Sequence, residues 1–147
     1  MRKTLLAWRG HRSLTAADWW LLAGAAAAQA AVWAALRVMT LSTLRSSATL
    51  LRRPMKFILR GGDERVIWAV EATGRRLSGL STCLVRAVVV ETRCGSGERP
   101  VRLEIGVRRT PAGALQSHAW VRDGHRVIVG GPVEHDFVPI VAWDTAA

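Results

Sequence analysis

Residues 81–107, STCLVRAVVVETRCGSGERPVRLEIGV, change from the apolar spacing of a helix to that of a strand. Apolar side chains recur at intervals of three and four through residues 84–91, which favours a helix although the run 88–90 is β-branched. Ser81 or Thr82 can cap this helix, which then begins at Cys83. After a glycine-rich break, apolar residues alternate strictly with other residues through 101–107, the pattern of a half-buried strand.

The chain beyond this stretch reads as an antiparallel sheet. Residues 117–121 (SHAWV) and 125–129 (HRVIV) are strand-like and flank the pair Asp123-Gly124, which is a strong hairpin signal. The apolar run 137–143 contains Pro139. Because proline cannot donate a backbone hydrogen bond, we expect this run to form an edge strand.

The chain before this stretch reads as helices. Residues 15–53 are rich in Ala and Leu, with Thr15 and Asp18 as a capping pair at the start. From Leu36 onward, leucines and arginines interleave as in an amphipathic helix with a basic side, which we expect Pro54 to end. Residues 63–77 predict another helix, with acids in its first turn and arginines in its last.

These patterns predict an α+β fold with two regions, residues 1–62 and residues 63–147. The chain has 147 residues, half of them apolar, which suffices for one core and a small helical addition. Residues 1–62 hold 10 Lys/Arg and one acid, whereas residues 63–147 hold 11 Arg and 10 acids. We therefore expect the basic first region to meet an acidic partner, such as a peptide, phospholipid headgroups or nucleic acid.

The segment 19–36, WWLLAGAAAAQAAVWAAL, has no charged residue and reaches the lower length limit of a membrane span. It consists mostly of Ala and has Gln29 in its middle, so we favour a soluble helix packed on the rest of the fold. Peripheral membrane attachment, a true span and a secretory signal are the alternatives. Two cysteines are too few for a disulfide framework, and no Cys/His spacing indicates zinc, so we expect a cytoplasmic protein.

Cys83 and His118 are the two residues that could form a catalytic pair of nucleophile and base. A cysteine nucleophile needs a helix N-terminus, a neighbouring imidazole or both to populate the thiolate, and Cys83 has the first of these. His118 lies on a strand that the sheet can bring against that helix. Cys94 is about 16 Å away along the same helix, too far for a disulfide with Cys83. A buried structural role for Cys83 is the alternative.

The runs STCLVRAVVVETRCGSGERPVRLEIGV and SHAWVRDGHRVIVGG resemble the leader peptidases of lasso-peptide biosynthesis, which belong to the transglutaminase-like, papain-related thiol enzymes. The Cys-Leu-x-Arg-Ala run, the Ile-Gly-Val strand and the His-Ala-Trp-Val run match in order and spacing. The resemblance implies a transglutaminase-like core with Cys83 as the nucleophile and His118 as its base. It also implies that residues 1–62 are a helical region packed on that core.

The third catalytic residue is where this sequence departs from the family. Family members with a full triad carry an Asp about a dozen residues after the His, a place that falls near Gly130 here, where no carboxylate stands. The candidates downstream are Asp136 and Glu134, which we rank above Asp123 in the hairpin turn. A backbone carbonyl could orient the imidazole less well.

The resemblance implies cleavage of a leader peptide from a lasso-peptide precursor. A separate leader-recognition protein would grip the leader, and an ATP-using lasso cyclase would act next and contact this protein. No Gly-Lys-Ser/Thr phosphate motif is present, so we expect no nucleotide, cofactor or metal in this chain. A transglutaminase-type acyl transferase is the alternative enzyme. A basic nucleic-acid-binding or membrane-binding protein is the alternative outside enzymes, although no nucleic-acid-binding motif is visible.

Overall fold

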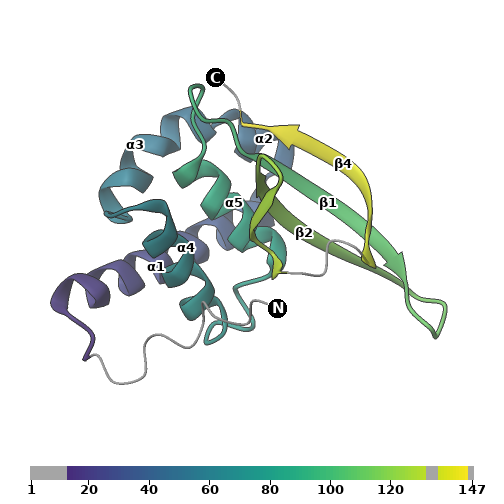
Figure 1. Ribbon diagram of the computed structural model, residues 1–147, viewed down its shortest axis with the longest axis horizontal. Coiled ribbons are helices and arrows are strands. Elements are labelled where there is room, and N and C mark those ends of the chain that lie inside the picture. Colours follow the sequence, from purple (N-terminus) through teal and green to yellow (C-terminus); the bar gives the residue numbers. More distant parts are fainter. Residues whose placement is uncertain (1–12, 132–135, 146–147) are drawn as a thin grey trace.

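The computed structural model describes residues 13–131 and 136–145. These residues form five helices and one four-stranded antiparallel sheet, so the predicted α+β fold is confirmed. Figure 1 shows the helices gathered on one side of the molecule and the sheet on the other, with α5 in between. The elements are α1 (Ala16–Val38), α2 (Leu41–Ser46), α3 (Ala48–Ile58), α4 (Asp63–Gly74), α5 (Cys83–Cys94), β1 (Arg102–Arg109), β2 (Leu115–Asp123), β3 (Arg126–Val129) and β4 (Val138–Asp144).

The sheet has the strand order β3-β2-β1-β4, with every neighbouring pair antiparallel. The predicted hairpin joins β2 to β3, and Gly124 in its turn has a φ of 56°, a conformation that glycine adopts without strain. Strand β4 lies at an edge, as Pro139 predicted, and its pairing with β1 shifts register between Ile105 and Gly106. The short β3 forms the other edge and pairs only with the end of β2.

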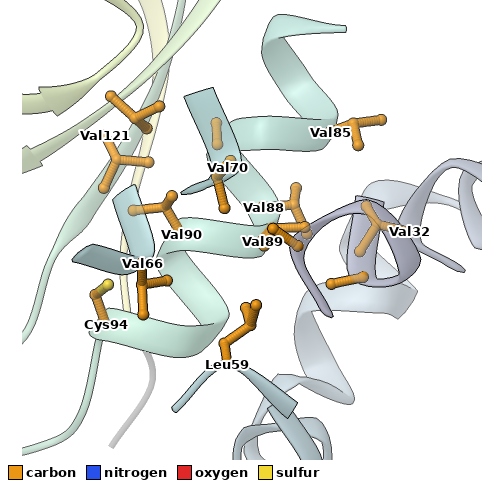
Figure 2. Close-up of a cluster of buried hydrophobic side chains, with 14 of the residues drawn as sticks. Val32, Leu59, Val66, Val70, Val85, Val88, Val89, Val90, Cys94 and Val121 are labelled. Carbon is orange, nitrogen blue, oxygen red and sulfur yellow. The ribbon is translucent and has the colours of Figure 1, made fainter. Parts of the chain in front are cut away.

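Helix α5 is the centre of the hydrophobic core. The predicted start and end of this helix are confirmed, and the side chain of Thr82 accepts a hydrogen bond from the amide of Val85. Its valines point to several sides: Figure 2 shows Val88 and Val89 beside Val32 of α1, and Val90 on the side of Val121 in β2. Burial against helices on one side and the sheet on the other explains why this β-branched run is helical.

The helices predicted for residues 15–53 are present as α1, which ends at Val38, the short α2, which Thr40 caps, and the first part of α3. Their end differs from the prediction. The prediction that Pro54 ends the helix is wrong, because α3 continues through it to Ile58. Proline removes one backbone hydrogen bond, and burial of Met55 and Leu59 just beyond it holds the last turn against the core.

Helix α1 packs against α4 and α5, as expected for a helix that is part of the fold. The Thr15–Asp18 capping box is present, and Asp18 also forms an ion pair with Arg65 of α4 at 2.5 Å. Among the described residues, α1 alone is long and apolar enough to cross a membrane by length and composition, and a third of that apolar segment is buried inside the protein.

Gln29 links α1 to α4 and to the residues just before α5 through buried hydrogen bonds. Its side chain is fully buried, and its Nε2 donates to Thr73 Oγ1 at 2.6 Å and to the Val70 carbonyl at 3.2 Å. The hydroxyl of Ser81, just before α5, donates to its Oε1. A polar residue in the middle of an apolar helix is thus satisfied entirely within the protein.

Replacing Gln29 with leucine should lower the free energy of unfolding by about 1–3 kcal/mol, because Ser81 and Val70 would keep buried polar groups without this partner. Urea denaturation followed by circular dichroism measures the loss. Ala31→Leu, at an exposed position of the same helix, is the matched control and should change stability little. Equal stabilities of the two variants would show that the Gln29 hydrogen bonds contribute nothing.

Candidate active site

Cys83 occupies the first turn of α5 and is a free thiol that is partly exposed. Thr82 caps the helix, and its backbone carbonyl accepts from the amide of Arg86 while its hydroxyl accepts from the amide of Val85. The amides of Cys83 and Leu84 are therefore the first-turn N–H groups that Thr82 does not engage. The N-terminus of a helix carries a partial positive charge, which favours negative charge on groups beside it.

His118 lies in β2, opposite Gly106 of β1. Its Nε2 is 2.7 Å from the carbonyl oxygen of Gly130, just after β3. A carbonyl oxygen can only accept a hydrogen bond, so Nε2 carries a proton and donates. In the neutral ring, Nδ1 is then the nitrogen that can accept a proton.

The ring of His118 belongs to an aromatic cluster on the sheet. Its centroid is 5.2 Å from that of Phe137 and 6.2 Å from that of Trp120. Side chains alternate along a strand, so His118 and Trp120 share one side of β2 while Ala119 and Val121 point to the other and join the core around α5. The imidazole is therefore held by residues of the sheet rather than by the core.

Helix α5 packs against the side of β2 that carries Ala119 and Val121. His118 points to the other side of the strand, so the structure does not bring the Cys83 and His118 side chains together. The two described side chains are not hydrogen-bonded to each other. The pairing of Cys83 with His118 therefore stays a prediction. The arrangement supplies a thiol at a helix N-terminus and an imidazole with a defined proton acceptor on the neighbouring element.

The three candidates for the third residue lie in different places. Asp136 is exposed, and its carboxylate lies 3.5 Å from the guanidinium of Arg108. Asp123 ends β2, about 17 Å along the strand from His118, and forms an ion pair with Arg99 at 2.5 Å. Glu134 is outside the described residues. Among the described residues, the His118 ring is hydrogen-bonded to the carbonyl of Gly130 and not to Asp136 or Asp123.

A surface cavity of about 340 Å³ adjoins this region. Residues 127–131 line it from the sheet side, and Arg86 and Glu71, joined by an ion pair of 2.9 Å, line it from α5 and α4. The cavity therefore lies between α4 and α5 on one side and β3 with the following glycines on the other, and neither Cys83 nor His118 lines it. In the sequence, Arg86 stands out only as part of the Cys-Leu-x-Arg-Ala run, and nothing there predicts its place beside a cavity.

Cys94, at the other end of α5, has a different environment. It is buried and unpaired, and burial is the main reason that its thiol pKa rises from 9.0 to about 12, with the nearby Asp63 carboxylate adding to the rise. The expectation that Cys83 and Cys94 are not joined is confirmed. Among residues 13–131 and 136–145, no group of three or more His, Cys, Asp or Glu side chains is placed to hold a metal ion.

Iodoacetamide at pH 8 should therefore label Cys83 and leave Cys94 unmodified in the folded protein, since alkylation requires an accessible thiolate. The Cys94 thiol stays protonated until the pH approaches 12. Peptide mass mapping after labelling gives the modified site, and labelling in urea is the control in which both cysteines react. Labelling of Cys94 at a rate equal to that of Cys83 in the folded protein would contradict the burial described above.

The fold agrees with a comparison against known protein families. The profile of the transglutaminase-like superfamily matches residues 4–142, nearly the whole chain. The protein therefore belongs to the transglutaminase-like superfamily, which fits a cysteine peptidase or an acyltransferase. Searches of curated proteins and of solved structures gave no match.

Proposed function

We propose that this protein is a cysteine peptidase that removes the leader peptide from a lasso-peptide precursor. The observation that carries the chemistry is the Cys83 thiol at the capped N-terminus of α5 in a transglutaminase-like chain. The choice of substrate rests on the resemblance of the motifs around Cys83 and His118 to the lasso leader peptidases. We place the protein in the cytoplasm, with peripheral attachment at the inner face of the membrane as the alternative.

The proposed reaction is acyl transfer through sulfur. Because the imidazole lies on the side of β2 away from α5, the proposal requires that precursor binding first brings it to Cys83. His118 then takes the Cys83 proton at Nδ1, and the thiolate attacks the carbonyl carbon of the last leader residue. The oxyanion is stabilised by N–H groups at the start of α5, where Thr82 leaves the amides of Cys83 and Leu84 unengaged. The C–N bond breaks, the core peptide leaves as an amine with the proton from His118, and water hydrolyses the thioester to release the leader.

The basic N-terminal region is the proposed docking surface for the separate leader-recognition protein. Trp20 of α1 and Phe57 of α3 are each 63% exposed. Arg60 stacks on Phe57 at 4.3 Å, and together with Trp20 it lines a shallow cavity of about 460 Å³. Exposed aromatic rings beside guanidinium groups suit a partner that presents acidic and apolar side chains. Contact with the lasso cyclase is proposed for the same region.

Trp20→Ala should weaken binding of the leader-recognition protein by at least about tenfold, because a large aromatic anchor at an interface contributes on the order of 2 kcal/mol. Leu115→Ala, which removes an exposed apolar side chain at the far hairpin, is the matched control and should bind normally. Isothermal titration calorimetry measures both. Equal affinities would exclude this face as the docking surface.

The test of the proposed function is to incubate the protein with a precursor peptide and its leader-recognition protein, and to weigh the products. Hydrolysis yields the free leader acid and the core peptide with a new amino terminus. A second arm contains a primary amine in excess: a leader that carries the amine would favour the acyltransferase alternative. An intact precursor in both arms would contradict the proposed function.

A further inference from the structure

Gly130 lies beside His118, near the candidate site, in a position that leaves no room for a side chain. Gly130 has a φ of 105°, which side chains rarely allow. A Cβ built on it would lie 2.5 Å from Trp120 Cβ and 3.0 Å from the carbonyl oxygen of Ala119. Only glycine fits at this position. The chain thus leaves β3 in a conformation that turns the Gly130 carbonyl toward the imidazole.

We infer that the main-chain carbonyl of Gly130 is the positioning group for His118, in the place where a triad enzyme uses a carboxylate. This inference rests on the proposed function for its catalytic meaning. The carbonyl accepts the Nε2 proton at 2.7 Å, so it fixes the tautomer and orientation of the ring, with Nδ1 left as the base. Any proton that Cys83 gives to His118 is then received at Nδ1.

Two observations support the carbonyl over the carboxylate of Asp136. Trp120 and Phe137 pack against the imidazole ring. The hydrogen bond to Gly130 then fixes the ring rotation that this packing leaves open. Asp136 is itself exposed and placed against Arg108, whose guanidinium also stacks on Phe137 at 4.7 Å. The contact given for the Asp136 carboxylate is thus with Arg108, whereas the hydrogen bond of the His118 ring is with Gly130.

A neutral carbonyl orients the ring but stabilises the imidazolium less than a carboxylate does. The enzyme would depend on substrate and its recognition partner to bring the thiol and imidazole into contact. His118 lies on the side of β2 away from α5, so this contact requires a change in the position of the imidazole.

The direct test is NMR of the full-length protein labelled with ¹⁵N in histidine and ¹³C in glycine carbonyls. We expect His118 as the Nε2–H tautomer, with a hydrogen-bond-mediated coupling from Nε2 to the carbonyl carbon of Gly130. The Nδ1–H tautomer, or an Nε2–H ring without this coupling, would overturn the inference. This readout needs no cleavage, so an inactive protein that shows the coupling would sink the proposed function and leave the Gly130 assignment standing.

Two glycine variants give the kinetic arm of the test. Gly130→Ala should lower kcat for leader cleavage at least tenfold with little change in KM, since it displaces the carbonyl and not the substrate. Gly131→Ala is matched, because Gly131 also has a positive φ, 73°, but no atom crowds its Cβ position; it should lose less than threefold. Equal losses in the two variants would overturn the positioning role. If Gly130→Ala does not fold, the NMR result on the unaltered protein decides.

Discussion

Replacing Cys83 with alanine should reduce leader cleavage by on the order of 10⁴-fold or more, because no other group can form the acyl intermediate once the nucleophile is removed. Cys83 is partly exposed in the first turn of α5, and Thr82, which caps that helix, is unchanged in the variant. The loss should therefore occur without a change in the fold. Quantitative mass spectrometry of leader and core peptide, with circular dichroism of the variant, measures both.

Cys94→Ala is the matched control for this prediction. It also removes a thiol from α5, but from a buried position at the opposite end of the helix. It should keep cleavage within about threefold while losing some stability through the cavity that it leaves. Cleavage that survives in Cys83→Ala, or that is lost equally in Cys94→Ala, would exclude Cys83 as the nucleophile.

The largest loss of stability is expected from Arg93→Ala. Arg93 is 8% exposed, and its guanidinium donates to the carbonyls of Leu59 at 2.8 Å and Gly61 at 2.7 Å. It also pairs with Asp63 at 3.4 Å. This side chain thereby ties α5 to the linker between α3 and α4. Its removal should lower the free energy of unfolding by about 3–5 kcal/mol, because buried acceptors lose a charged donor.

Urea denaturation measures this effect, and Arg99→Ala is the control. Arg99 also pairs with Asp63, at 2.9 Å, but its side chain is 59% exposed. Pairs of exposed groups contribute little because water screens them. We therefore expect Arg99→Ala to be much closer to the unaltered protein. The account of the α3–α4 linker would be wrong if the two variants had the same stability.

Much of the fold could be predicted because local and tertiary preferences agree. The capping residue Thr82, the spacing of apolar residues in α5 and the Asp123-Gly124 turn each specify a local structure that the core then uses. Pro54 shows where this agreement fails. Its effect on the backbone is local, but the burial of Leu59 beyond it is decided by helices that lie far away in the sequence.

Less of the candidate site than of the fold could be predicted from the sequence. Cys83 and His118 are marked by motifs, and the helix start and strand that carry them could be predicted from pattern. The partner of His118 is a main-chain carbonyl, which every residue has, so its identity leaves no side-chain signal. The signal that does exist is the Gly130-Gly131 pair, since paired glycines indicate a backbone that needs positive φ. The side of β2 on which His118 lies depends on which face the core covers.

The most direct test of the central claim is to trap the acyl-enzyme. The protein, precursor and leader-recognition protein are mixed for a short time, quenched with acid and digested, and the peptide that contains Cys83 is weighed. The account predicts that this peptide gains the mass of the leader acyl group as a thioester, which hydroxylamine removes. Leader cleavage with Cys83 unmodified at every time point, or with the acyl group on another residue, would contradict it.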